Sequence, residues 1–232
     1  MINLDNKVVK EIINILVTPD SESRHLYLQS IKNVSGEGTQ NSRGTHGWDY
    51  RYNSILEMTK KFNLKHIKLG RGKLWEAILL LGPENELYVC FSESNLKRII
   101  RKGKDSHYLR LLNLFNKELD KMKVLSQQLT LFDQEVEEKD VLIRQAREML
   151  HMMETDPSKV IVFAFDNSFI STAKAFAFNT NHQIVWEEDL TDLIDVNYHL
   201  VLKDDNVEPE KRKSTNINET KKEKKRIVKL KS

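Results

Sequence analysis

The sequence predicts an α+β protein, in which an antiparallel β-meander and a second β-hairpin unit carry a long helical region packed on the sheet. Three observations predict this class. The apolar residues first recur at helical spacing, then at every second position, and then at helical spacing again. After Asp204 the chain loses its apolar residues, so a disordered basic C-terminal tail is expected. The expected parts are an N-terminal helical segment at 1–63, an α+β core at 64–203 that can form one domain with it, and a tail at 204–232.

The first part of the chain favours helices. Residues 5–17 place apolar side chains three or four positions apart, as in an amphipathic helix. Thr18-Pro19-Asp20-Ser21 ends this helix and can cap a shorter one at about 21–32. Residues 33–47 hold four of the eight glycines, which is typical of a flexible loop. Helical spacing resumes at Trp48 and ends near residue 62.

The apolar period then changes to two, which predicts three consecutive strands joined by glycine-containing turns. Because short turns join neighbouring antiparallel strands, these three form a meander. A helix follows that begins at Ser92 or Ser94 and runs through Arg101. The three strands are His66–Leu69, Lys73–Leu81 and Glu86–Phe91.

Residues 106–154 have strong helical spacing. They fit either one helix of about fifty residues or two helices broken near Thr130–Gln134, and a hairpin or kink is the favoured interpretation. A continuous helix would be a coiled-coil candidate and would imply a homodimer. Further strands are expected at Val160–Phe165, Ala173–Phe178 and Gln183–Trp186, then a short acidic helix at 187–195 and a possible last strand at His199–Leu202.

The charge of the chain is divided between an acidic body and a cationic C-terminal segment. Residues 211–232 contain ten Lys or Arg and two Glu, a net charge of +8. Because the whole chain carries +3, residues 1–210 carry −5. Such segments bind phosphate or an acidic protein surface, since Lys and Arg displace condensed counterions. A solvated tail that only aids solubility is the alternative.

A second cationic region spans residues 60–110, where twelve Lys or Arg stand against five acidic residues. If the first predicted hairpin and the helix ending near Arg101 lie side by side, they form a phosphate-binding face. Otherwise each set faces solvent separately. The leading prediction is a non-enzymatic accessory or regulatory protein that binds DNA or RNA through this face and the tail. The candidate contact residues are Lys68, Arg71, Lys73, Arg98, Arg101 and Lys102.

A cluster of cationic and polar aromatic residues surrounds the glycine-rich loop. Arg24, His46 and Asp49, if brought together, could cleave RNA by acid–base catalysis without a metal. A toxin-like RNA-cleaving enzyme is therefore one alternative function, and a protein-interaction module that dimerises through 106–154 is another. The structural alternative for the cluster places Trp48 in the core and Asp49 in a cap or an ion pair.

Two short motifs in this region, Arg24-x-x-Tyr27 and Trp48-Asp49-x-x-x-Asn53, resemble an uncharacterised protein family of low-GC bacteria and their phages. The resemblance covers about residues 8–200 and brings no known activity with it. It implies only a small cytoplasmic accessory protein, for which a regulatory role or one in phage–host conflict would fit.

No metal site and no cofactor are predicted. The seven histidines are scattered, and none lies at i, i+4 spacing from another. Cys90 is the one cysteine and lies in an apolar run, so we expect it to pack in the core. The longest apolar stretch, Ala77–Leu81, is too short to span a membrane, and the N-terminus lacks signal-peptide features. A cytoplasmic protein without a membrane partner is expected.

Overall fold

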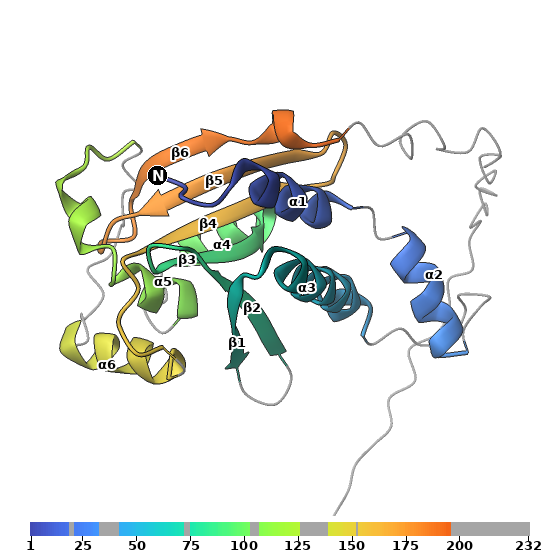
Figure 1. Cartoon of the computed structure of the whole chain (residues 1–232), viewed down its shortest axis with the longest axis horizontal. Helices are drawn as coiled ribbons and strands as arrows, with labels where there is room; N and C mark the ends of the chain where they lie inside the picture. The colour runs from blue at the N-terminus through green and yellow to red at the C-terminus, as the bar shows by residue number, and fades with distance from the viewer. Residues whose placement is uncertain are drawn as a thin grey trace, which may run out of the picture. The chain divides into compact units, whose positions relative to one another are not determined.

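A six-stranded mixed sheet with helices on both faces forms the fold (Figure 1). The computed structural model describes residues 1–18, 21–32, 42–71, 75–102, 107–125, 139–151 and 153–195. Met1–Asp195 form one compact unit, and the N-terminal helices share its apolar core with the strands. The predicted α+β class is therefore confirmed.

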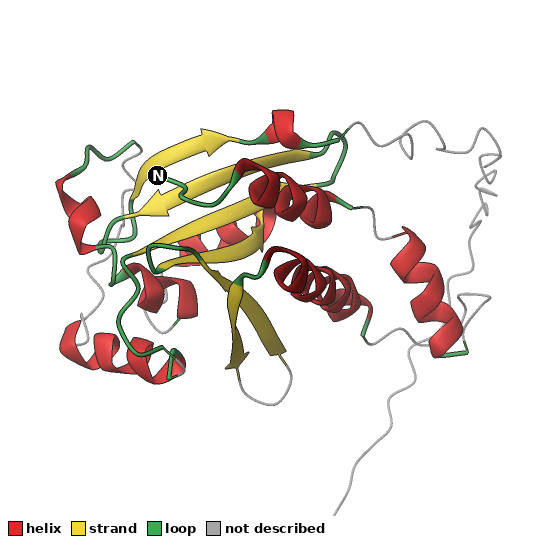
Figure 2. Ribbon diagram, in the orientation of Figure 1, coloured by secondary structure: helices red, strands yellow, loops and turns green. Residues whose placement is uncertain are grey.

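In the described part of the chain, three α-helices precede three strands, and this order then occurs a second time (Figure 2). The described α-helices are α1 (Asn6–Val17), α2 (Ser21–Ser30), α3 (Arg43–Phe62), α4 (Glu93–Lys102), α5 (Tyr108–Asn113) and α6 (Lys139–Met149). The strands are β1 (Lys65–Arg71), β2 (Trp75–Leu81), β3 (Glu86–Ser92), β4 (Lys159–Asp166), β5 (Thr172–Phe178) and β6 (Ile184–Asp189). Two 3-10 helices are η1 (Lys117–Lys121) and η2 (Thr191–Leu193).

The order of the strands in the sheet is the order in the sequence, β1 to β6. β1, β2 and β3 are antiparallel, which confirms the predicted meander, and β4, β5 and β6 form a second antiparallel set. The two sets meet where β3 pairs with β4 in parallel. Leu87–Phe91 and Val160–Phe165 are buried throughout, as is typical of parallel strands covered on both faces.

The two faces of the sheet have different helical covers. Tyr88 of β3 points toward the N-terminal side, since its hydroxyl accepts from the backbone N–H of Asn3. Phe91 lies three residues further along β3, so its side chain points to the other face, where it stacks on Tyr108 of α5. Figure 1 shows α1 in front of the strands and α4 partly hidden behind them. Helices α1 and α3 thus cover one face, and α4 and α5 cover the other.

A buried charge pair marks the start of the parallel pair. Glu86 and Lys159 are register partners, and the Lys159 Nζ lies 3.6 Å from Glu86 Oε1. Glu86 is fully buried, and its other carboxylate oxygen accepts from the backbone N–H of Glu84 at 3.0 Å. Gly82 leaves the room for this carboxylate, because a Cβ there would lie 2.4 Å from it. The pair therefore favours a single register between β3 and β4.

Arg51 of α3 connects α3 to the end of α1. Its side chain is 5% exposed and donates to three backbone carbonyls, those of Leu16 at 2.8 Å, Gly47 at 3.0 Å and Thr18 at 3.2 Å. The guanidinium also lies 4.9 Å from the ring centroid of Phe165 on β4. Since the last carbonyls of a helix have no partner within it, Arg51 satisfies the end of α1 and anchors it over the sheet.

Helix α1 is also tied to the last described residues. The Asn14 side chain donates to the carbonyl of Leu193 at 3.1 Å and accepts from the backbone N–H of Asp195 at 2.8 Å. Lys10 adds an ion pair with Asp195 at 2.6 Å. The first helix thus packs beside the final strand hairpin.

Helix α3 begins at Arg43, so the prediction of a loop through residue 47 was wrong at its C-terminal end. The carbonyl of Ser42 accepts from the backbone N–H groups of Thr45 and His46 and starts the helix there. Tertiary contacts offset the helix-weakening effect of the glycines, because Arg51 binds the Gly47 carbonyl. Residues 33–41 of the predicted loop lie outside the described residues.

A continuous helix over 106–154 is also wrong, because α5 ends at Asn113. Asn116 fixes the chain to the sheet just after the end of α5. Its buried amide accepts from the N–H of Val160 at 2.6 Å and donates to the carbonyls of Val160 at 3.1 Å and Phe178 at 2.7 Å. Four apolar residues of the expected coiled-coil seam pack in the cores around the chain's own sheet and are not free to form a dimer: Leu109, Leu112, Phe115 and Leu119. The predicted break near 130–134 lies outside the described residues.

The acidic segment 187–195 is not the predicted helix. Glu187 and Asp189 belong to β6 and pair with Phe176 and Lys174 of β5. Only the short η2 follows, at Thr191–Leu193. The proposed strand at 199–202 lies outside the described residues.

We expect Arg51→Lys to destabilise the protein by about 2–3 kcal/mol, because one ammonium group cannot reach all three carbonyls and leaves buried acceptors without donors. Urea unfolding followed by circular dichroism measures this. Arg98→Met, at an exposed position of α4, is the matched control and should stay within about 0.5 kcal/mol of the parent. Equal unfolding midpoints for Arg51→Lys and the parent would refute the anchoring role.

Candidate nucleic-acid interface

Three cations form a strip along α4. The buried residues Leu96 and Ile99 hold α4 on the sheet, whereas Arg98, Arg101 and Lys102 are exposed and spaced by three and four. Residues at i, i+3 and i+4 lie on one side of a helix, so the three charges share one face. We call these three residues the α4 strip.

The charge of the α4 strip is not neutralised by the parts of the chain that the structure describes. Arg98 donates to the side-chain oxygen of Asn95 at 2.6 Å, a neutral partner. Lys97 differs, since it pairs with Glu93 one turn earlier at 2.7 Å. No described carboxylate forms an ion pair with any member of the strip. Within the described residues, the strip therefore has no ion-pair partner to lose when it binds an anion.

Lys68 does not join the α4 strip. It pairs with Glu76 across the β1–β2 hairpin at 2.8 Å. His66, which lies on the same face of β1, has a ring nitrogen 3.3 Å from the hydroxyl of Thr59 in α3. Lys68 therefore lies on the α3 face of the sheet, opposite α4. Arg71 ends β1, and Lys73 lies outside the described residues.

The N-terminal candidates are only partly brought together. The ring of His46 in α3 stacks on Tyr27 of α2, with centroids 4.7 Å apart. Asp49 lies one turn after His46 and is exposed, as is Arg24 on α2. No described contact joins Arg24, His46 and Asp49 into one site, and the neighbouring Arg51 is the structural anchor already described.

A cavity of about 260 Å³ lies beside α4, between that helix, α5 and the β5–β6 turn. We call it the α4–α5 cavity. Its walls combine apolar side chains with amides, an imidazole and the cationic side chain of Arg110. The lining residues include Ile99, Ile100, Leu109, Asn113, Phe178 and His182.

Two polar groups of the α4–α5 cavity lack hydrogen-bond partners among the described residues. They are Oδ1 of Asn113, a side chain that is 1% exposed, and Nδ1 of His182. Burial lowers the pKa of His182 to about 3, and the positive charges of Arg110 and Lys139 act in the same direction. The imidazole is therefore neutral at physiological pH.

Asn113 and His182 were not among the functional residues predicted from the sequence. A signal for Asn113 exists, because it is a polar residue in the apolar run 111–115 at a position that helical spacing buries. His182 occupies a turn with positive φ, where it accompanies Asn179 and Gln183, and nothing local distinguishes it from an exposed turn residue.

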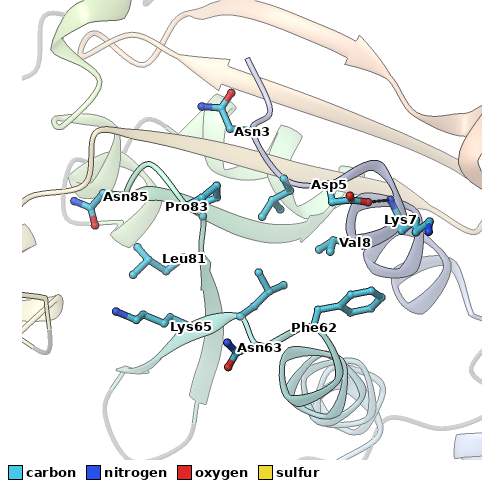
Figure 3. A pocket seen from close by; sticks show the side chains of 13 residues that line it. Asn3, Asp5, Lys7, Val8, Phe62, Asn63, Lys65, Leu81, Pro83 and Asn85 are labelled. Atoms are coloured by element: carbon cyan, nitrogen blue, oxygen red, sulfur yellow. Dashed lines mark hydrogen bonds between the residues drawn. The ribbon is translucent and has the colours of Figure 1, made fainter.

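A larger groove of about 640 Å³ lies on the opposite face (Figure 3). It is lined by the start of α1, the end of α3, the start of β1 and the β2–β3 turn. Several of its polar groups already have structural partners. Asp5 caps α1 through the Lys7 N–H at 2.7 Å, and Asn85 binds Thr155 at 3.1 Å. These polar groups therefore stabilise the start of α1 and the β2–β3 turn.

Metal and thiol chemistry find no support in the described part of the chain. It contains no group of three His, Cys, Asp or Glu that could hold a metal ion. Cys90 is buried, as predicted, and burial raises the pKa of its thiol to about 12. No helix among the described residues is long and apolar enough to cross a membrane.

The chain matches the model of a family of unknown function, DUF5986, over residues 4–231. It belongs to this family, which confirms the resemblance to an uncharacterised family seen in the sequence. No curated protein and no solved structure matches the chain. The site must therefore be interpreted from its own chemistry.

We expect the stability of the protein to fall as the pH is lowered from about 6.5 toward 3. The folded state keeps His182 neutral, whereas the unfolded chain binds a proton below about pH 6.5, which costs about 1.4 kcal/mol per pH unit. His182→Asn, which tolerates the positive φ, should flatten this dependence, and His25→Asn at an exposed site should not. A His182 imidazole, identified by the resonance that His182→Asn removes, that titrates near pH 6.5 in NMR spectra of the folded protein would contradict the prediction.

Proposed function

We propose that this DUF5986 protein is a cytoplasmic accessory or regulatory protein that associates with DNA or RNA without cleaving it. The observation that carries the proposal is the α4 strip, three exposed cations on one helix face with no described carboxylate paired to them. A nucleic-acid backbone offers a regular row of phosphates for such a strip. Binding releases the counterions condensed on those phosphates, which favours association at low salt.

The C-terminal end of α4 stabilises the positive charges of the strip. Arg101 and Lys102 lie in the last turn of the helix, where the carbonyl ends of the peptide dipoles favour positive charge. The two side chains can therefore stay exposed at little cost before phosphate binds. This strip binds the backbone, and so supplies affinity without reading sequence.

The C-terminal segment supplies a second contact in this proposal. Residues 211–232 carry a net charge of +8 on the same chain as the α4 strip. Once the strip has bound, the segment meets the same polymer at a high effective concentration, so the two contacts strengthen each other. Lys211–Lys231 thus extend the contact and increase its salt dependence.

The hairpin candidates Lys68, Arg71 and Lys73 remain a prediction of a separate contact. Lys68 lies on the α3 face, and its exposed ion pair with Glu76 is worth at most about 1 kcal/mol. Phosphate could displace that pair, but a duplex held on the α4 strip would not reach it. We therefore assign the hairpin a secondary role.

We expect the triple substitution Arg98→Glu, Arg101→Glu, Lys102→Glu to weaken binding of the full chain to DNA and RNA of any sequence. Three lost phosphate contacts should lower the slope of log K against log salt by about 2–3. Fluorescence anisotropy with a labelled 20-base-pair duplex, titrated between low and physiological salt, measures both quantities.

The matched control is Lys60→Glu with Lys61→Glu, which reverses charge on the opposite face of the sheet and should change neither affinity nor slope by more than the altered net charge requires. Binding that survives the triple substitution but disappears on removal of residues 204–232 would assign the contact to the C-terminal segment alone. The proposal for the α4 strip would then be wrong.

A further inference from the structure

We infer that the α4–α5 cavity binds a single planar heterocycle, the unpaired base of a nucleic-acid strand. This inference rests on the proposed function and adds a preference for single-stranded over duplex ligands. It starts from the buried amide of Asn113, which lines the cavity and whose Oδ1 has no hydrogen-bond partner among the described residues.

A buried polar atom without a partner is costly, and proteins generally satisfy such groups. Here the unsatisfied oxygen belongs to a side chain that is 1% exposed at the wall of a cavity. Because an amide can present either its oxygen or its NH₂ group, Asn113 can accept from or donate to a ligand edge. A ligand edge that reaches this amide would therefore satisfy a buried polar group that lacks a partner.

His182 adds a second polar group of the same character. Its imidazole is neutral, so one ring nitrogen donates and the other accepts. Its Nδ1 also lacks a described partner. An amide and a neutral imidazole together recognise a ligand edge with both donors and acceptors, and Arg110 in the same wall adds a positive charge beside them.

The lining and the volume of the cavity suit a single ring with apolar faces. Ile99, Leu109 and Phe178 supply an apolar wall against which a ring can pack. The volume of about 260 Å³ is below the roughly 300–1,000 Å³ typical of pockets for drug-sized ligands, so it fits one ring system rather than a large cofactor. A nucleobase has this combination of flat apolar faces and an edge of donors and acceptors.

The position of the cavity joins it to the α4 strip. Ile99 and Ile100 line the cavity, and they are flanked in the sequence by Arg98 and Arg101 of the strip. A helix with its side chains is about 10–12 Å across, so a strand needs only a few nucleotides to pass from the cavity to the strip. One base would enter the cavity while neighbouring phosphates contact the cations.

Duplex nucleic acid cannot use the cavity in this way, since its bases are stacked and paired. An unpaired base enters without that cost, and stacking with hydrogen bonds contributes about 1–3 kcal/mol per base. The full chain should therefore bind single strands more tightly than duplexes, whereas the α4 strip alone would favour neither.

The test compares the full-length protein with Asn113→Leu, which keeps the size of the side chain and removes its polar atoms. The probes are a labelled 12-nucleotide single strand, the matching duplex, and the four nucleoside monophosphates observed by saturation-transfer NMR. We expect Asn113→Leu to weaken single-strand binding roughly tenfold and to leave duplex binding unchanged. Monophosphate binding that is lost in Asn113→Leu identifies the cavity directly. A monophosphate that binds as tightly as the single strand would indicate that the base comes from a free nucleotide.

Ile100→Trp is the second variant, because it fills the cavity from its half-buried rim and does not depend on Asn113→Leu folding. It should reproduce the selective loss of single-strand binding. The triple variant of the α4 strip should instead weaken single strand and duplex together. The inference is overturned if the parent binds single strand and duplex equally and neither cavity variant changes any probe, a result that leaves the proposed function standing. Absence of binding to every polymer, strand and duplex alike, would overturn the proposed function itself.

Discussion

The parallel pairing of β3 with β4 is the constraint on which the rest of the arrangement depends. All other neighbouring strands are antiparallel and need only short turns, but a parallel pair requires the chain to return along the length of the sheet. Residues 93–158 make that return and supply α4 and α5 to one face. The α4 strip and the α4–α5 cavity lie on elements of this crossover. The Glu86–Lys159 pair, at the start of β3 and β4, favours the register between the two strands that the crossover connects.

Much of the fold was predictable because the apolar period reports on local structure. The run from Val160 to Phe165 has no polar interruption, and such a run indicates a strand buried on both faces. The errors arose where one polar side chain decides the outcome through distant contacts. Leu109 to Leu119 keeps a helical apolar pattern, yet Asn116 binds the ends of β4 and β5 and ends the helix early. That contact spans more than forty residues of sequence, so no local pattern contains it.

The site was predictable in composition but not in arrangement. The spacing of Arg98, Arg101 and Lys102 gave one helix face correctly, since a helix has a fixed period. Their relation to Lys68 depends on which face of the sheet each element covers, and the strand alternation alone does not reveal it. Arg51 is a similar case, because its burial on three backbone carbonyls depends on the packing of α3 against the end of α1. Asn113 interrupts an apolar run in the sequence, but only the structure shows that it and His182 line one cavity and lack described hydrogen-bond partners.

The bond between Asn14 and the residues near 195 has a consequence for the order in which the protein folds. Helix α1 is made first, but its partners on β4, β5 and η2 come from the last third of the compact unit. Helix α3 can pack on α1 early, but the part of the apolar face of α1 that contacts the sheet has no partner until β4 and β5 have been made. Long-range closure of this kind slows folding, and a nascent chain that stalls after the first meander would expose Ile12, Ile13 and Leu16 to chaperones.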